Sequence, residues 1–120
     1  CVLVVENDPD VRDHLEAALQ MLGYQVATAS DGPAAMALLD KLPALDLLIT
    51  DIVMPRGMNG LDVAENVRKR YAGVRILYTS GNADQAVGTS DKADNSVAFL
   101  PKPYRRTVLA QTIRQLLDAA

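Results

Sequence analysis

Short apolar runs alternate along the chain with longer segments in which apolar residues recur at helical spacing. Val2–Val5 is a continuous apolar run, as expected of a strand that is covered on both faces. Asp8 and Pro9 then stand in the order of a helix N-cap and first helical residue, and Gly23 is placed to end that helix. The same pattern predicts further strands at Gln25–Ala29, Leu45–Thr50, Val74–Tyr78 and Val97–Leu100.

Helical segments lie between and after these strands. The turn Ser30–Pro33 begins the second helix, and Arg105–Asp118 forms the last one. The loop Met54–Gly60 precedes a third helix, whose predicted core residues are Leu61, Ala64 and Val67. The segment Asn82–Ser96 has few apolar anchors, so we expect a fourth helix there to be short or irregular. This alternation predicts an α/β fold, with a doubly wound five-stranded parallel sheet and helices on both faces.

Composition narrows the classes of protein that this chain can represent. With 120 residues, 49% of them hydrophobic and 22% charged, residues 1–120 are expected to form a single folded domain. The net charge of −3 argues against direct nucleic-acid binding, and no apolar run approaches the ~20 residues of a membrane span. A single cysteine favours a cytoplasmic protein, and the start at Cys1 indicates a domain excised from a longer chain.

Polar residues follow the apolar part of every central strand. Glu6 and Asn7 end the first strand, Asp51 the third, Thr79 the fourth and Lys102 the fifth. Because ligands bind at the carboxyl ends of parallel strands, we expect these side chains to share one crevice. The carboxylates and the amide oxygen suit a hard cation such as Mg²⁺, while the ammonium and hydroxyl groups suit an incoming phosphate. A central carboxylate could itself be the nucleophile, because aspartyl-phosphates are established covalent intermediates.

Taken together, four short motifs resemble the receiver domain of two-component response regulators. They are Val4–Pro9, Thr50–Pro55 with Gly60, Thr79–Gly81 and Lys102–Tyr104. The resemblance covers essentially the full chain and implies a flavodoxin-like sheet with the strand order 2-1-3-4-5. It also implies a signalling domain rather than an enzyme in the usual sense. Such a domain catalyses its own phosphoryl transfer and its own slow dephosphorylation.

The resemblance further implies which partner and metal the domain uses. Asp51 falls on the residue that takes a phosphoryl group from a histidine kinase or a histidine phosphotransfer domain. Glu6, Asn7 and Asp51 fall on the ligands of Mg²⁺, with Mn²⁺ as a second candidate, and Val53 falls where a backbone carbonyl completes the set. The implied reaction is therefore phosphorylation of Asp51 in the presence of a divalent cation.

Three further residues match the family's phosphate-sensing positions. Thr79 falls on the hydroxyl that turns toward the phosphoryl group, and Lys102 falls on the lysine that pairs with it. Phe99 falls on an aromatic position that swings inward upon switching, although an aromatic residue in a buried strand can equally be core. Val53 and Gly81 replace side chains that orient the attacking water in many receivers, which favours slow loss of phosphate.

The chain departs from the commoner receiver pattern at three places. Asn7 stands where an aspartate is usual, the loop after Asp51 has the extra residue Gly57, and the segment Asn82–Ser96 is polar. Together with the missing initiator Met, the last two features favour the C-terminal receiver of a hybrid sensor histidine kinase. The polar segment also predicts a weak homodimer or none.

Two alternatives bear on these motifs. An aspartyl-phosphate phosphatase or phosphotransferase usually needs a second acid two residues after the nucleophile, and Val53 occupies that position here. A degenerate receiver that only binds other proteins, without phosphorylation, finds support in Asn7 alone. Asp8 is interpreted as a helix cap rather than a metal ligand, and His14 as a solvated helix residue.

Overall fold

In this computed structural model, residues 1–52, 59–80, 97–101 and 105–118 are described. The strands are β1 (Val2–Val5), β2 (Val26–Ala29), β3 (Leu47–Asp51), β4 (Arg75–Ser80) and β5 (Val97–Pro101). The helices are α1 (Pro9–Met21), α2 (Gly32–Leu39), α3 (Gly60–Arg70) and α5 (Arg106–Asp118). All neighbouring strands pair in parallel, in the order β2-β1-β3-β4-β5. This confirms the predicted α/β class and strand order.

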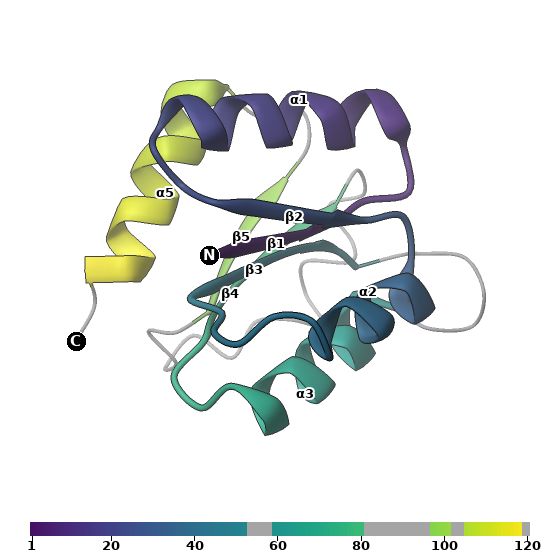
Figure 1. Ribbon diagram of the computed structural model, residues 1–120. Coiled ribbons are helices and arrows are strands. Elements are labelled where there is room, and N and C mark those ends of the chain that lie inside the picture. The colour runs from purple at the N-terminus through teal and green to yellow at the C-terminus, as the bar shows by residue number, and fades with distance from the viewer. Residues whose placement is uncertain (53–58, 81–96, 102–104, 119–120) are drawn as a thin grey trace.

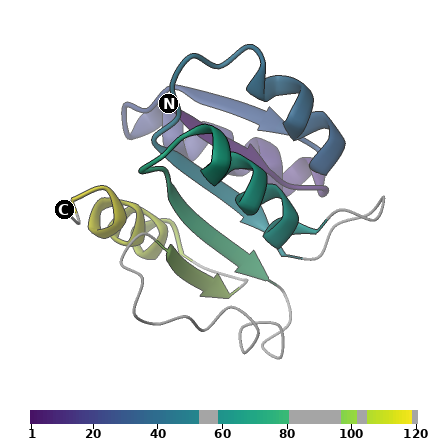
Figure 2. The same cartoon turned by 90° about the horizontal axis from the view of Figure 1, so that it is seen from below.

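Helices cover both faces of the sheet, with α1 and α5 on one side and α2 and α3 on the other (Figures 1 and 2). Because successive strand residues point to opposite faces, β1 supplies both layers. Val2 and Val4 belong to a buried cluster with Leu15 of α1, whereas Leu3 and Val5 belong to a second cluster under α2 and α3. Strand β1 is buried along its whole length, as its continuous apolar run predicts.

Short polar side chains cap the N-termini of α1, α2 and α3. The Asp8 carboxylate accepts the N–H of Asp10 at 2.9 Å, which confirms its role as the N-cap of α1. Asp31 caps α2 in the same way, and Asn59 forms a reciprocal capping box with Asp62 at the start of α3. Gly23 follows α1 with φ +95°, a conformation that residues with a Cβ rarely adopt.

Helix α3 differs in one respect from its predicted pattern. Ala64 and Val67 are buried as expected, but the prediction that Leu61 is buried is wrong, because this residue is 38% exposed. Val63 takes the inward position in the first turn instead. The apolar stripe of α3 therefore runs through positions 60, 63, 64 and 67, which share one face at helical spacing.

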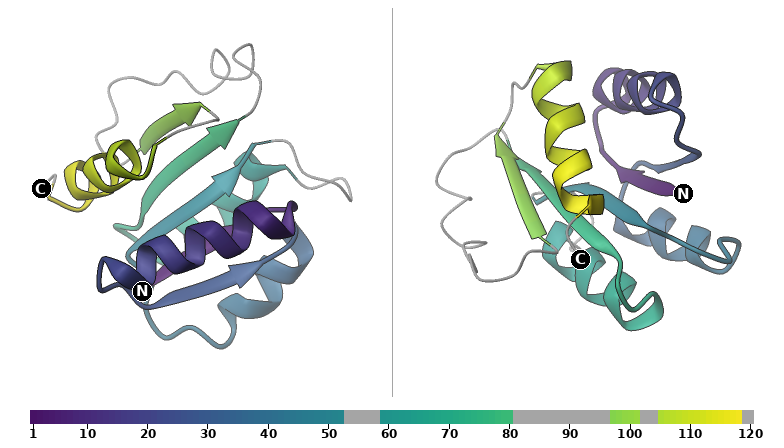
Figure 3. Two further views of the ribbon diagram at one scale, coloured as in Figure 1. Left: turned by 90° about the horizontal axis from the view of Figure 1, so that it is seen from above. Right: turned by 90° about the vertical axis from the view of Figure 1, so that its left-hand side faces the viewer.

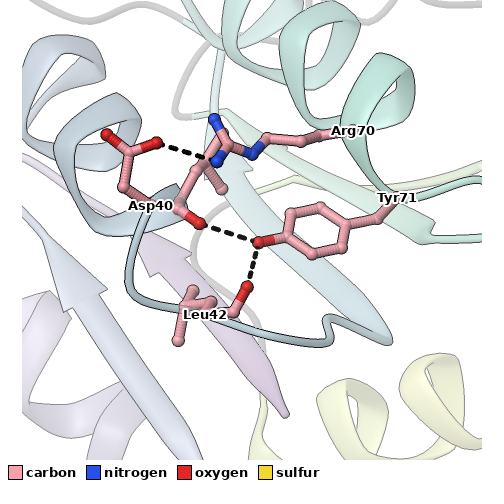
Figure 4. Close-up of polar contacts among 5 residues, drawn as sticks. Asp40, Leu42, Arg70 and Tyr71 are labelled. Atoms are coloured by element: carbon pink, nitrogen blue, oxygen red, sulfur yellow. Dashed lines mark hydrogen bonds and ion pairs between the residues drawn. The ribbon is translucent and has the colours of Figure 1, made fainter.

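The end of α3 is tied to the end of α2 at the edge where β4 begins (Figure 4). The Tyr71 hydroxyl lies 3.0 Å from the Leu39 carbonyl oxygen and 2.5 Å from that of Leu42, so its proton serves two acceptors. Beside it, Arg70 donates to the Asp40 carboxylate at 2.8 Å. These contacts lie at the amino ends of the strands, opposite to the edge where the predicted site lies.

Two further sequence predictions concern helices. The expected short fourth helix at Asn82–Ser96 lies outside the described residues. Among the helices that are described, none combines the length and the apolar character needed to cross a membrane.

Candidate functional site

Three of the predicted site residues come together at the carboxyl edge of the sheet. Asp51 ends β3 and is the register partner of Thr79 in β4. On the other side of β3, Val5 pairs with Thr50, so Glu6 and Asp51 each follow the same rung of the ladder. Figure 3 shows that α1 begins at this edge, beside the arrowheads of the central strands. The topology therefore gathers two carboxylates and a hydroxyl on three adjacent strands.

Glu6 is the most deeply buried of the acidic residues at this edge, with 2% of its surface exposed. Its backbone N–H donates to the Ala29 carbonyl oxygen at 3.0 Å, which continues the pairing of β1 with β2. Its carboxylate accepts the N–H of Asp8 at 3.0 Å, and its carbonyl oxygen accepts a guanidinium N–H of Arg12 at 3.0 Å. The carboxylate and the carbonyl oxygen of Glu6 thus both accept hydrogen bonds from residues at the start of α1.

Asp51 is half-buried, and the backbone around it is held by several hydrogen bonds. Its carbonyl oxygen accepts the Thr50 hydroxyl at 3.0 Å, and the next N–H, of Ile52, donates to the Thr79 carbonyl oxygen at 3.1 Å. The Ile52 carbonyl oxygen in turn accepts the N–H of Gly60 at 2.7 Å. These bonds fix the direction in which the chain leaves β3.

Gly60 approaches this backbone so closely that no side chain fits. A Cβ at position 60 would lie 2.1 Å from the Asp51 carbonyl oxygen and 2.9 Å from the Ile52 Cα. Glycine is therefore required for α3 to begin against the strand end that carries Asp51. Gly60 belongs to the second receiver motif, but the sequence alone does not indicate which atoms it approaches.

The remaining predicted residues divide into those that the structure places and those that it does not. Thr79 is 1% exposed, and Asn7 is exposed directly after buried Glu6. Phe99 pairs with Tyr78 and packs, partly buried, against the core cluster under α2 and α3. Val53 and Lys102 lie outside the described residues.

The donor set at this edge fits a hard divalent cation. Glu6 and Asp51 provide carboxylate oxygens on neighbouring strands, and Asn7 adds an exposed amide oxygen. Mg²⁺ prefers oxygen ligands and binds proteins through one or two carboxylates while keeping several waters. Within the described parts of the chain, no three His, Cys, Asp or Glu side chains form a metal-binding group. A cation at this edge would thus depend on two carboxylates together with neutral oxygens.

Arg12 is a residue at this edge that the sequence motifs do not single out. Its guanidinium bonds to the carbonyl of Glu6, six positions earlier in the chain. The spacing itself is a usable signal, because a side chain in the first turns of a helix leans back toward the helix start.

The sequence pattern of the response regulator receiver domain matches residues 2–114 of this chain. The chain belongs to this family. Its five-stranded parallel sheet in the order 2-1-3-4-5 agrees with the fold of the receiver structures that it resembles. The family assignment made from four short motifs is confirmed.

Relatives and solved structures agree with this assignment. The receiver is 34% identical over 118 residues to the sensor kinase CckA of Brucella abortus, covering 98% of this chain but 12% of the kinase. It spans about half of several curated transcriptional regulators. A Sinorhizobium medicae response regulator receiver protein superposes with a TM-score of 0.86 at 27% identity, covering 98% of this chain and 94% of that one. TrrA of Thermotoga maritima, solved in complex with Mg²⁺–BeF, has a TM-score of 0.79 at 30% identity and 97% coverage of both chains.

Proposed function

We propose that this receiver accepts a phosphoryl group on Asp51 from a phosphohistidine of a histidine kinase or a histidine phosphotransfer domain. The observation that carries the proposal is the register pairing of Asp51 with buried Thr79, beside buried Glu6 at the end of the adjacent strand. Asp51 is half-buried at this edge, so part of the residue remains accessible to a partner. Family membership supports the same reaction.

The proposed reaction is a direct displacement at phosphorus. A carboxylate oxygen of Asp51 forms the new O–P bond while the N–P bond to the donor histidine breaks, and the departing imidazole takes up a proton. Such transfers need positioning and neutralisation of charge rather than further covalent chemistry. In the proposal, Lys102 offsets charge on the phosphoryl oxygens, and Thr79 donates its hydroxyl to one of them.

We propose that Glu6, Asn7, Asp51 and the Val53 carbonyl hold Mg²⁺, with Mn²⁺ as an alternative. When bound, the divalent ion offsets the negative charge of the phosphoryl oxygens. The TrrA complex with Mg²⁺–BeF supports this metal in a protein of similar fold. After phosphorylation, Thr79 would bias the domain toward a second conformation, with Phe99 as the aromatic residue that follows it.

The phosphoacceptor is tested with a small phosphodonor. Incubation with acetyl phosphate and Mg²⁺ should add the mass of one phosphoryl group to the wild type, measured by intact mass spectrometry. Asp51→Asn should abolish this addition, because the attacking carboxylate oxygen is lost. Asp46→Asn is the matched control, since Asp46 lies just before the opposite end of the same strand and is exposed. Equal labelling of Asp51→Asn and the wild type would show that another residue is the acceptor. No labelling of the wild type would favour a receiver that acts only as an interaction module.

The same proposal extends to the protein that contains this domain, its location and its partners. We infer that residues 1–120 are one domain of a longer cytoplasmic protein, and the similarity to the sensor kinase CckA supports a receiver within a hybrid kinase. The net charge of −3 supports a protein partner rather than direct binding to nucleic acid. We expect slow dephosphorylation and a monomer, or at most a weak homodimer.

A further inference from the structure

Arg12 makes a contact that the proposed reaction does not use directly. It lies in α1 four residues after the N-cap Asp8, and its own N–H completes the first helical hydrogen bond, to the Asp8 carbonyl oxygen at 2.9 Å. Its half-buried side chain reaches back past the helix start, where it donates to the Glu6 carbonyl oxygen at 3.0 Å. The contact therefore joins α1 to the end of β1.

The dipole of α1, taken by itself, disfavours a cation at this position. A helix N-terminus carries partial positive charge, so acidic side chains are favoured there and basic ones at the other end. Helix α1 follows this rule at its start, where Asp10 lies in the first turn, but it has no basic residue in its last turn. A guanidinium directed at the N-terminal end thus needs a compensating partner, and the Glu6 carbonyl supplies one.

The same short segment determines where the Glu6 carboxylate lies. The backbone of Glu6 is held by β2 through its N–H and by Arg12 through its carbonyl oxygen, while its carboxylate is held by the Asp8 N–H. The carbonyl that Arg12 binds belongs to the peptide unit joining Glu6 to Asn7. A rotation of this unit would move Asn7 and Asp8, and with them the N–H that holds the carboxylate.

From this geometry we propose that Arg12 is a positioning residue for divalent-cation binding. By clamping the Glu6–Asn7 peptide unit, it holds the Glu6 carboxylate and the Asn7 amide in the arrangement that the cation requires. The proposal rests on the proposed metal-dependent function of this site. The Arg12 side chain then has two opposite effects on the affinity for the cation. Its positive charge repels the cation, whereas its hydrogen bond to the Glu6 carbonyl orders the ligands.

Substitution distinguishes these effects by the sign of the change. With Mg²⁺ alone as the probe, calorimetric titration of Arg12→Met should give a Kd about tenfold higher than that of the wild type. Loss of a partner of a metal ligand typically costs tenfold or more in affinity. If Arg12 acted only through its charge, the same variant would bind Mg²⁺ more tightly. Arg70→Met is the matched control, because it removes the same charge and one hydrogen bond at the opposite edge of the sheet. Its Kd should equal that of the wild type.

A second readout does not require metal. The Asp8 N–H that donates to Glu6 should exchange with solvent about tenfold faster in Arg12→Met than in the wild type, measured by NMR without Mg²⁺. The amides of core strand β1 should be unchanged, which reports that the variant is folded. Phosphorylation of Arg12→Met should need more Mg²⁺ for half-maximal rate but reach the wild-type maximum, because the acceptor side chain is intact.

Arg12→Lys keeps the charge and a donor at similar reach, and its Kd for Mg²⁺ should lie between those of the wild type and Arg12→Met. This variant decides the question if Arg12→Met does not fold, and a wild-type Kd for Arg12→Lys would then overturn the proposal. An unchanged or lower Kd for folded Arg12→Met also overturns it while leaving the phosphoacceptor role intact. A wild type that binds no Mg²⁺ overturns both proposals.

Discussion

Position 7 is where a single residue most alters the chemistry expected of this receiver. Asn7 is exposed and directly follows Glu6, a residue that is 2% exposed and whose carboxylate accepts the Asp8 N–H. An amide oxygen carries no net charge, so the set proposed to hold the cation has only the carboxylates of Glu6 and Asp51. Because ligand charge strongly influences affinity for hard cations, this asparagine should make unphosphorylated protein a weak Mg²⁺ binder.

Asn7→Asp should therefore tighten Mg²⁺ binding. Bonds to charged groups contribute about 1.5–3 kcal/mol, which corresponds to a Kd lower by roughly ten- to a hundredfold. Calorimetric titration of both proteins measures the change, and Asn66→Asp serves as a control, since Asn66 is an exposed residue of α3. Identical Kd values for Asn7→Asp and the wild type would show that position 7 does not contact the metal.

Sequence patterns predict some residue roles in this chain better than others. The cap at Asp8 and the acidic end of β1 follow from local order, because each depends on neighbours within a few positions. Periodicity gives the inward face of α3 only approximately, so Leu61 is 38% exposed although the pattern places it in the core. The contact from Arg12 to a backbone oxygen has only its spacing from Glu6 as a signal, since any residue can supply the acceptor carbonyl.

At the scale of elements, the junction of β3 and α3 positions Asp51, the proposed phosphoacceptor. Strand β3 ends at Asp51, and α3 begins at Gly60 against the same backbone. The order and approximate bounds of the strands can be predicted from apolar runs, because parallel strands buried on both faces are nearly continuous in apolar residues. Which backbone atoms meet across the junction depends on tertiary packing, which periodicity does not encode.

Gly60→Ala should destabilise the fold and slow phosphorylation. The new methyl group would lie 2.1 Å from the Asp51 carbonyl oxygen, so α3 or the end of β3 must shift. Overpacking of this kind costs about 1–3 kcal/mol, measurable by urea unfolding. Gly23→Ala is the control: it meets nothing within 4 Å but has φ +95°, so about 1–2 kcal/mol should be lost from strain, with the labelling rate unchanged. Wild-type labelling and stability in Gly60→Ala would contradict the close approach.

The tie between α2 and α3 makes a separate prediction at this scale. Tyr71→Phe should lower the free energy of unfolding by about 1 kcal/mol, since the Leu42 carbonyl loses its donor. The Leu39 carbonyl keeps a bond from the Leu42 N–H at 3.3 Å, which limits the loss. Arg70→Met breaks only the exposed pair with Asp40 and should cost between zero and about 1 kcal/mol. Urea unfolding measures the free energy of unfolding of both variants. A larger decrease for Arg70→Met than for Tyr71→Phe would show that the ion pair, and not the tyrosine hydroxyl, contributes more to stability.

At the scale of the whole molecule, the contacts that join α2 to α3 and the candidate site lie at opposite edges of one sheet. The Tyr71 tie lies at the amino ends of the strands, whereas Glu6, Asp51 and Thr79 lie at the carboxyl ends. Two helical layers bury the strands between these edges, so the site residues directly follow, or belong to, strands of the buried core (Figure 1). Any ligand that binds only the folded site will therefore also stabilise the entire domain.

Mg²⁺ and a phosphoryl mimic should stabilise the domain and strengthen each other's binding. Mg²⁺ at ten times its Kd should add about 1.4 kcal/mol of stability, or on the order of 5 °C in Tm. Beryllofluoride brings negative charge that Asn7 does not supply, so it should lower the Kd for Mg²⁺. By linkage, Mg²⁺ must lower the Kd for beryllofluoride by the same factor.

Titration calorimetry in both orders measures the two factors. Asp51→Asn should remove the coupling, because the mimic binds the acceptor carboxylate, while Asp46→Asn should retain it. Independent binding of the two ligands to the wild type would refute a shared site at the end of β3.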